Sequence, residues 1–142
     1  MKTVVLDASV VVKLFFEEKD SKAAEQCVAQ AEELLAPDLV WVETANVIWK
    51  RQRRGDLTAD AASDIARSIL ALPVVTHPAA DLVPDALELA MQLDRTVYDC
   101  LYLALAVKTK SVMITGDKRL VSSLAGGPLA KHVVWIGERL AE

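Results

Sequence analysis

Four acidic residues each stand beside a strongly apolar stretch of the sequence. Asp7 ends the run TVVLD, and Asp117 follows SVMITG. Glu43 interrupts LVWVETANVIW, and Asp99 interrupts VYDCLYLALA. An isolated buried carboxylate is unfavourable unless a cation pairs with it, and two like charges 4 Å apart repel by about 4 kcal/mol at an effective dielectric constant near 20. If these four carboxylates converge, a divalent metal ion is the simplest explanation.

Three of the acids also have local explanations, which the residues alone leave open. An Asx turn would account for Asp7, and a helix N-cap before KRLVSSL would account for Asp117. Asp99 lies three residues after Thr96, a spacing that resembles a capping box with Asp in place of the usual Glu. A capping role and a metal-binding role do not exclude each other, because a helix N-terminus can lie at a ligand-binding edge.

The fourth acid, Glu43, is harder to explain by local structure. It lies in the second turn of an expected helix, beyond the first free N–H groups, and its neighbours are apolar. Asn46 follows three residues later and therefore shares its face. Two hydroxyls add to the pattern, because Ser9 and Thr115 each lie two residues from an acid in the arrangements D-x-S and T-x-D. A helix cap would account for Ser9 and a strand position for Thr115, but their pairing with the acids is what points to a functional site.

Short apolar runs alternate with helical patterns along the chain. Strands are expected over 3–6, 34–36, 73–77, 111–115 and 132–136. Helices are expected over about 9–16, from 20 or 21 onward, and over 37–54, 58–70, 81–93, 96–108 and 117–124. This alternation predicts an α/β fold in which right-handed crossovers build a mostly parallel sheet. Ligands bind outside the carboxyl ends of such strands, where Asp7 and Asp117 fall.

Composition predicts a single well-packed domain over 1–142. The chain is 53% hydrophobic and 25% charged, which is typical of an ordered globular protein. No run approaches 18 uncharged apolar residues, and Asp7 and Lys13 interrupt the apolar start, so neither a membrane span nor a signal peptide is expected. Cys27 and Cys100 match no metal or redox spacing. We expect them to be reduced core residues of a cytoplasmic protein.

A basic cluster precedes Gly55 and consists of Lys50, Arg51, Arg53 and Arg54. Cations followed by Gly are favoured at a helix C-terminus, which is one explanation for the cluster. Contact with the phosphates of a nucleic acid is a second explanation, and the two are compatible. The net charge of −4 argues against broad coating of DNA, but the local sign of charge matters more than the sum.

The motifs together resemble a known family. They are TVVLDASVVVK, the E-x-x-N of Glu43 and Asn46, VYDCLYLALA and MITGDKRL, which follow one another over almost the whole chain. Each motif alone is weak, but the ordered set is similar to that of PIN-domain ribonucleases, and most of all to VapC-type toxins of toxin–antitoxin pairs. The resemblance implies a three-layer α/β/α domain with a central, mostly parallel sheet.

The resemblance also implies roles for the residues. The catalytic residues would be Asp7, Glu43, Asp99 and Asp117. The ligands of Mg²⁺ or Mn²⁺ would be Asp7, Asp99 and Asp117, with support from Ser9, Asn46 and Thr115. The substrate would be RNA, which the basic cluster would contact. The family further implies a homodimer, a small antitoxin that fills the active groove, and a higher toxin–antitoxin assembly.

Other functions remain as alternatives. One is a PIN-like module that binds RNA or protein without cleaving RNA, against which the intact acids argue. Another is a PIN nuclease that is not a toxin. A phosphoacceptor receiver domain is disfavoured because Asp56 follows a basic helix instead of a strand, and a nucleotide-binding fold would need a Gly-rich phosphate loop that the sequence lacks.

Overall fold

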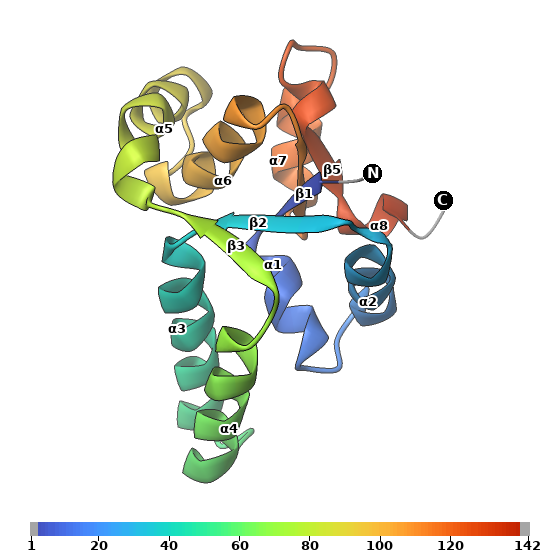
Figure 1. The fold of residues 1–142 in the computed structure, drawn as a ribbon, viewed down its shortest axis with the longest axis vertical. Coiled ribbons are helices and arrows are strands. Elements are labelled where there is room, and N and C mark those ends of the chain that lie inside the picture. Colours follow the sequence, from blue (N-terminus) through green and yellow to red (C-terminus); the bar gives the residue numbers. More distant parts are fainter. Residues whose placement is uncertain (1–2, 140–142) are drawn as a thin grey trace.

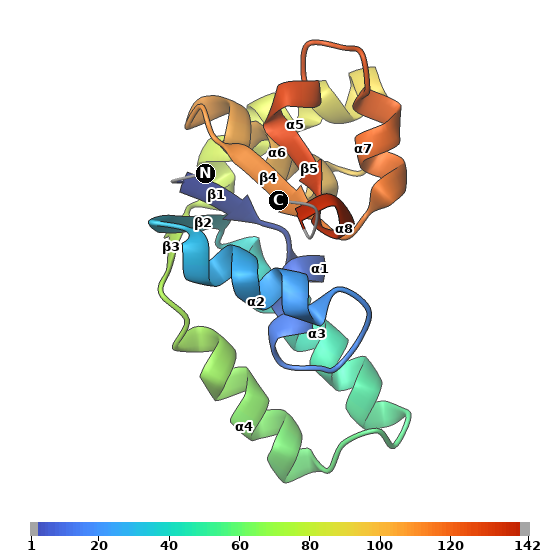
Figure 2. The same cartoon turned by 90° about the vertical axis from the view of Figure 1, so that its right-hand side faces the viewer.

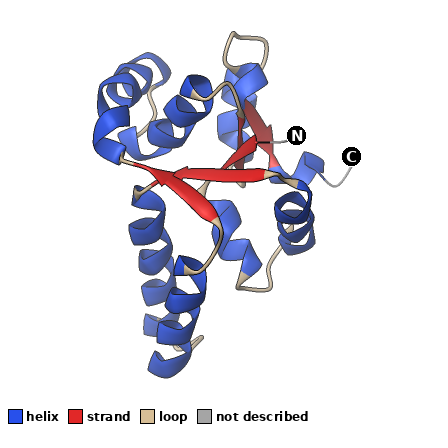
Figure 3. Ribbon diagram, viewed as in Figure 1, coloured by secondary structure: helices blue, strands red, loops and turns tan. Residues whose placement is uncertain are grey.

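The computed structural model describes residues 3–139. Its strands are β1 (Thr3–Leu6), β2 (Glu33–Pro37), β3 (Val74–His77), β4 (Val112–Thr115) and β5 (Val133–Trp135). Its longer helices are α2 (Ser21–Gln30), α3 (Leu39–Arg53), α4 (Ala59–Leu70), α5 (Ala79–Leu93), α6 (Val97–Lys108) and α7 (Lys118–Leu124). The short helical segments are α1 (Ala8–Val11), η1 (Val12–Leu14), η2 (Ala130–His132) and α8 (Ile136–Arg139). Helices and strands alternate along the chain, as Figure 3 shows.

The five strands form one sheet in the order β3-β2-β1-β4-β5, and every neighbouring pair is parallel. The central strand β1 lies between β2 and β4, with Val5 opposite Leu35 on one side and Met113 on the other. The chain builds outward from β1 to β3 and then returns to the other side of β1 for β4 and β5. The direction of building therefore reverses between β1 and β4, where open α/β sheets bind their ligands.

Helices cover both faces of the sheet. In the two views, α5, α6 and α7 lie on one side, and α1, α2, α3 and α4 lie on the other (Figures 1 and 2). Helix α6 packs on β1, β2 and β4, while α5 covers it from outside. This position explains why residues 100–106 are all buried, and hence why VYDCLYLALA is so apolar. The three-layer α/β/α architecture and the parallel sheet are confirmed.

Most expected elements are confirmed, and the differences lie at their ends. The last strand is shorter than expected, because His132 ends the turn η2 and Ile136 begins α8. The first helix ends at Leu14. Helix α5 begins at Ala79, whose N–H donates to the carboxylate of Asp38 at 2.9 Å.

The early start of α5 moves Pro84 out of the first turn, where we expected it. Pro84 lies inside the helix, and it has no N–H to donate to the carbonyl of Ala80. Both residues are exposed, so solvent can hydrate that carbonyl.

Gly55 ends α3 as the sequence predicts. Its φ of 87° is left-handed, a conformation that glycine adopts without the Cβ clash of other residues. The N–H of Gly55 donates to the carbonyl of Gln52, and the N–H of Asp56 donates to that of Arg51. These two bonds satisfy the last carbonyls of the helix in a Schellman motif.

Two other expectations concern the core and the membrane. Cys27 and Cys100 are buried, and no disulfide joins them. Within residues 3–139, no helix combines the length and the apolar character that crossing a membrane requires.

Candidate active site

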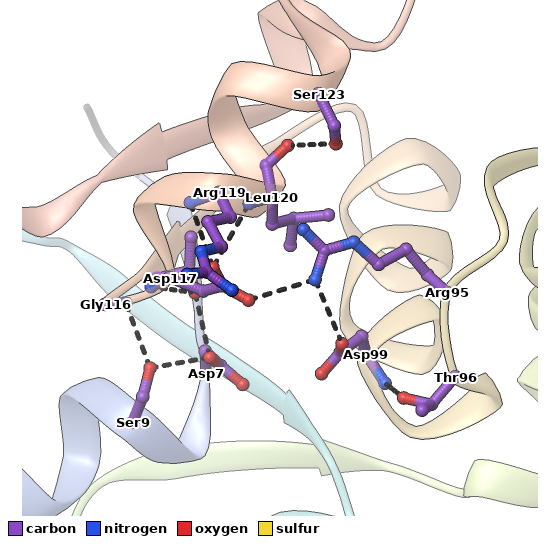
Figure 4. Close-up of polar contacts among 11 residues, drawn as sticks. Asp7, Ser9, Arg95, Thr96, Asp99, Gly116, Asp117, Arg119, Leu120 and Ser123 are labelled. Atoms are coloured by element: carbon purple, nitrogen blue, oxygen red, sulfur yellow. Dashed lines mark hydrogen bonds and ion pairs between the residues drawn. The ribbon is translucent and has the colours of Figure 1, made fainter.

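Asp7 follows β1 at the point where the sheet reverses its order. Its N–H donates to the carbonyl of Ile114 at 3.1 Å, which ties it to β4. Its Oδ2 accepts hydrogen bonds from Ser9 Oγ at 2.6 Å and from Thr115 Oγ1 at 2.9 Å. The N–H of Gly116 in turn donates to Ser9 Oγ at 2.9 Å (Figure 4). The D-x-S and T-x-D patterns therefore form one network around a single carboxylate.

The electrostatic environment of Asp7 is unfavourable for its charge. Burial raises the pKa of Asp7, the hydroxyls of Ser9 and Thr115 lower it, and the nearby charge of Asp99 raises it. The net pKa lies above the ordinary value of 3.8. A divalent cation is the kind of ligand that reverses this penalty, because an opposite charge favours the ionised carboxylate.

Asp117 caps a helix and also lies in the candidate site, the two roles that the sequence left open. Its Oδ1 accepts from the N–H groups of Arg119 and Leu120 at 3.0 and 3.1 Å, which caps α7. Its Oδ2 faces the guanidinium of Arg95, with Nη1 at 3.1 Å. The same nitrogen lies 3.8 Å from Oδ2 of Asp99 (Figure 4). One arginine thus lies between two of the predicted acids.

Asp99 stands in the first turn of α6, which Thr96 caps by accepting from the N–H of Asp99 at 3.2 Å. Burial raises the pKa of Asp99, the Arg95 charge lowers it, and the Asp117 charge raises it. The adjacent Cys100 is buried, and together with the Asp99 charge this raises the pKa of its thiol to about 11. Cys100 is therefore a protonated thiol at neutral pH and not a nucleophile.

Glu43 reaches the site from α3 and is held by a buried tyrosine. The hydroxyl of Tyr102 donates to Glu43 Oε1 at 2.7 Å across two helices. Burial raises the pKa of Glu43, the Tyr102 hydroxyl lowers it, and the charges of Asp7 and Asp99 raise it. The pKa of Tyr102 is itself raised by burial and by these carboxylates, so its hydroxyl stays a donor.

The four predicted acids come from distant parts of the chain and meet at one edge of the sheet. Each of the pairs Asp7–Asp99, Glu43–Asp7, Glu43–Asp99 and Asp99–Asp117 is close enough for one charge to raise the pKa of a partner. The acids therefore share one region of the molecule, and their role as ligands of a common ion stays a prediction.

The donor chemistry fits a hard divalent cation. All four side chains offer carboxylate oxygens, and Mg²⁺ is commonly held by one or two carboxylates with waters and substrate phosphate. No three Asp, Glu, His or Cys side chains within residues 3–139 are grouped closely enough to hold one ion together. The arrangement thus suits an ion with few protein ligands, or one that draws the carboxylates together.

The basic cluster lies at the far end of α3 from Glu43, and its members differ in their surroundings. Arg51 pairs with Glu18, and its guanidinium lies 4.2 Å from the ring centroid of Phe16. Arg54 pairs with Asp56 at 2.9 Å. The exposed members are Lys50, Arg53 and Arg54. Arg51 is therefore engaged within the fold, and its contact with phosphate stays a prediction.

Asn46 is exposed on α3 one turn after Glu43, as the helical spacing predicts. Within the described residues it forms no hydrogen bond to the acids. Its supporting role stays a prediction.

Two residues of the site were not singled out by the sequence. Tyr102 was part of a quoted motif, and a buried tyrosine needs a partner for its hydroxyl. Arg95 lies four residues before Asp99, a spacing at which opposite charges interact on a helix. That spacing was the available signal, although Arg95 precedes the helix.

Comparisons with known proteins show to which family this chain belongs. The profile of the PIN domain matches residues 4–125. Ribonuclease VapC3 of Pyrobaculum aerophilum is 39% identical over 118 residues, which cover 82% of this chain and 90% of the relative. This chain belongs to the PIN-domain family, in its VapC-type branch.

Solved structures share the fold of this VapC-type protein. PAE2754 of Pyrobaculum aerophilum matches with a TM-score of 0.70 at 22% identity and covers 99% of this chain and 91% of that chain. A toxin–antitoxin complex from Klebsiella pneumoniae matches with a TM-score of 0.63 at 17% identity and covers 92% of this chain and 95% of that chain. The family resemblance carried by the motifs is confirmed.

Proposed function

We propose that this VapC-type PIN protein is an endoribonuclease that hydrolyses phosphodiester bonds in RNA with Mg²⁺ or Mn²⁺, as the toxin of a toxin–antitoxin pair. Family membership and 39% identity to a ribonuclease support the activity. The observation that carries the proposal is the meeting of Asp7, Glu43 and Asp99 at the carboxyl edge of the sheet. Beyond the effect of burial, the charge of Asp99 raises the pKa of Asp7, and the charges of Asp7 and Asp99 raise the pKa of Glu43. Such mutual repulsion is expected of carboxylates that await a cation.

The proposed roles follow from the contacts of each side chain. Asp7 and Asp99 would hold the ion directly, and Asp117 would hold it directly or through a water. When bound, the ion would make water a better nucleophile and offset the charge that grows on the phosphoryl oxygens. Ser9 and Thr115 hold one oxygen of Asp7 and so fix its orientation.

Glu43 would orient the attacking water and accept its proton. Its raised pKa suits this role, because a general base works best when its pKa approaches the working pH. The hydroxyl of Tyr102 fixes one oxygen of Glu43 and leaves the carboxylate aimed from α3. Attack in line with the leaving oxygen would give a 5′-phosphate, as the family resemblance implies.

RNA would approach along α3. Lys50 and Arg53 are exposed there, and a helical rise of about 1.5 Å per residue places them roughly 10–15 Å from Glu43 along the axis. They would therefore contact phosphates some nucleotides away from the cleaved bond. In this proposal they replace Arg51 as the principal phosphate contacts.

Apolar surface supports the proposed protein partners, an antitoxin and a second copy of the chain. A groove between α3 and α4 is lined by Trp41, Val42, Ala45 and Leu70, and Val42 is 66% exposed. Three more exposed apolar side chains follow one another at every fourth residue of α5 and are Val83, Leu87 and Met91. Such patches mark interaction surfaces. The fold shared with a toxin–antitoxin complex agrees with this proposal.

The test of the activity is cleavage of end-labelled RNA by purified protein. Wild type should cleave with Mg²⁺ and stop in EDTA, and Asp7→Asn should fall to the level of the sample without enzyme. Asp85→Asn, an exposed acid on α5, is the matched control and should cleave as wild type does. Equal cleavage by Asp7→Asn would contradict the proposal. RNA binding without cleavage by the wild type would favour the non-cleaving alternative.

The test of the toxin role is growth. Induced expression of wild type alone should arrest cells, while Asp7→Asn should not. Coexpression of a short reading frame found beside the gene should relieve the arrest. Arrest by both proteins would show that toxicity has another cause.

A further inference from the structure

Arg95 is held in place by the turn between α5 and α6. Asp94 ends α5 in the left-handed conformation with φ of 54°, and the N–H of Arg95 donates to the carbonyl of Ala90 at 3.3 Å. The next residue, Thr96, caps α6. Both sides of Arg95 are therefore fixed by helix ends, and its side chain is only 21% exposed. It projects from this turn toward the acids (Figure 4).

One carboxylate oxygen of Asp117 and one of Asp99 face Arg95. Asp117 uses Oδ1 to cap α7 and turns Oδ2 to Arg95. Asp99 likewise turns its Oδ2 toward the same nitrogen, Nη1. These two oxygens are the nearest carboxylate ligands for a cation that enters between Asp99 and Asp117. The guanidinium therefore occupies the position in which an ion would compensate both charges.

The pairing is also poorly suited to be permanent. A strong arginine–carboxylate pair is bidentate, with two parallel N–H···O bonds to one carboxylate. Here one nitrogen serves two carboxylates, at 3.1 and 3.8 Å, and the longer contact is beyond hydrogen-bonding distance. Such an ion pair holds the carboxylates near one another, yet a divalent ion can replace it.

We propose that Arg95 is a resident counter-cation of Asp99 and Asp117, and that a divalent ion enters this side of the pocket by exchanging with it. This inference rests on the proposed metal-dependent function. In the metal-free protein, Arg95 stabilises the two acids against their mutual repulsion. When an ion binds, the guanidinium gives up Oδ2 of Asp99 and Asp117, so the ion's affinity reflects the cost of displacing it.

The test is titration of Mn²⁺ into metal-free, full-length protein by isothermal calorimetry, with thermal unfolding in EDTA as a second readout. Arg95→Met keeps the apolar stem of the side chain and removes the charge. Its Kd for Mn²⁺ should fall by about 10-fold, which corresponds to about 1.4 kcal/mol. Its melting temperature in EDTA should also fall, because two carboxylates lose their counter-charge. Arg95→Lys, which keeps the charge, should bind Mn²⁺ with nearly the wild-type Kd.

Arg119→Met is the matched control, because Arg119 is exposed beside the site and supplies its backbone N–H to Asp117. It should change the Kd by less than about twofold at 0.15 M salt, where charges beyond about 8 Å are screened. Should Arg95→Met not fold, Arg95→Gln carries the same expectation.

An unchanged or weaker affinity for Mn²⁺ in both neutral variants would overturn the exchange and leave the nuclease proposal standing. Weaker binding in particular would make Arg95 a residue that positions the ligands. Absence of Mn²⁺ binding by the wild type would overturn the exchange and the metal-dependent function together.

Discussion

The two halves of the acidic pocket are stabilised in different ways. Asp7 and Glu43 are held by neutral hydroxyls, from Ser9 and Thr115 in one case and from Tyr102 in the other. Asp99 and Asp117 share a charged partner, Arg95. We call these the hydroxyl-held half and the arginine-held half.

The two halves differ in what the partners of the carboxylates provide. Hydroxyls hold a carboxylate in one direction, whereas an arginine balances its charge. The hydroxyls leave the charge uncompensated, and burial raises the pKa values of Asp7 and Glu43. Burial also raises the pKa of Asp99, which the charge of Arg95 lowers only in part. An arginine compensates charge through a long side chain that can move. The hydroxyl-held half would therefore set where an ion binds, and the arginine-held half would adjust to it.

The largest effect on metal binding and RNA cleavage is expected at the buried hydroxyl of Thr115, which bonds to Asp7. Thr115 is fully buried, and Thr115→Val removes its hydrogen bond to Asp7 and the acceptor of the Asp117 N–H, with little change in shape. Loss of a residue that orients a metal ligand costs about 10–100-fold in metal affinity or activity. Titration with Mn²⁺ measures the loss of metal affinity, and the rate of RNA cleavage measures the loss of activity.

Thr109→Val is the matched control, because Thr109 bonds to the carbonyl of Leu105 at the other end of α6. It should leave Mn²⁺ affinity unchanged. Equal affinities in both valine variants would mean that the hydroxyl does not position Asp7.

For Tyr102→Phe we expect a smaller loss of the RNA cleavage rate, about 10-fold. This is the low end of the range for residues that orient a metal ligand. The Tyr102 hydroxyl lowers the pKa of Glu43, so its removal raises that pKa further. The base then stays protonated to a higher pH, and the acidic limb of the rate profile should shift to higher pH. Tyr98→Phe, on an exposed tyrosine of the same helix, should keep the wild-type profile. A uniform loss without a shift of the limb would limit Tyr102 to a packing role.

The pH dependence of stability tests how far burial destabilises the charge of Asp7. Asp7 binds its proton at a higher pH in the folded than in the unfolded state, where its pKa is near 3.8. Stability of the metal-free protein therefore rises as pH falls from neutral through the raised pKa, and this contribution is constant below the unfolded value.

Asp7→Asn removes the contribution of Asp7 to this dependence, so the variant should be at least as stable as wild type at neutral pH. Its advantage should shrink as pH falls. Thermal unfolding in EDTA across this range measures the difference. A variant that is less stable at every pH would make Asp7 a structural residue.

The smallest effect is expected outside the pocket, at Arg51. Arg51→Ala loses the ion pair to Glu18 and the contact with Phe16, which together stabilise the fold by about 1 kcal/mol. Chemical denaturation measures this loss, and RNA affinity should keep its salt dependence.

The double variant Lys50→Ala and Arg53→Ala serves as the counterpart. It should reduce the slope of log affinity against log salt by about 1.4, at about 0.7 for each phosphate contact with a single strand. If Arg51→Ala lowered the slope as well, its role in the fold would not exclude RNA contact.

Much of the fold follows from local patterns. The buried runs at β1 and β4 and the caps Thr58, Thr96 and Asp117 predicted their elements, because strand burial and helix capping depend on neighbouring residues. The ends were less predictable. Helix α5 begins early because Asp38, 41 residues away in sequence, caps it, and no local pattern contains that contact.

The residues of the candidate site likewise divide into those that the sequence predicted and those that it did not. Its acids were predictable because charge within an apolar run is conspicuous, and Ser9 and Thr115 because they are two residues from an acid. Their partners from distant parts of the sequence were less predictable. The Tyr102–Glu43 bond joins residues 59 apart, and Glu18 reaches Arg51 across 33 residues. Arg95 was not singled out by the sequence, because its contact with Asp117 spans 22 residues and depends on the turn after α5.

The most direct test of the central claim is an anomalous diffraction map of crystals soaked in Mn²⁺. The account predicts one strong peak about 2.0–2.3 Å from carboxylate oxygens of Asp7 and Asp99, a distance range typical of Mg²⁺-like ions with oxygen ligands. A peak elsewhere on the molecule, or none at a saturating Mn²⁺ concentration, would contradict it.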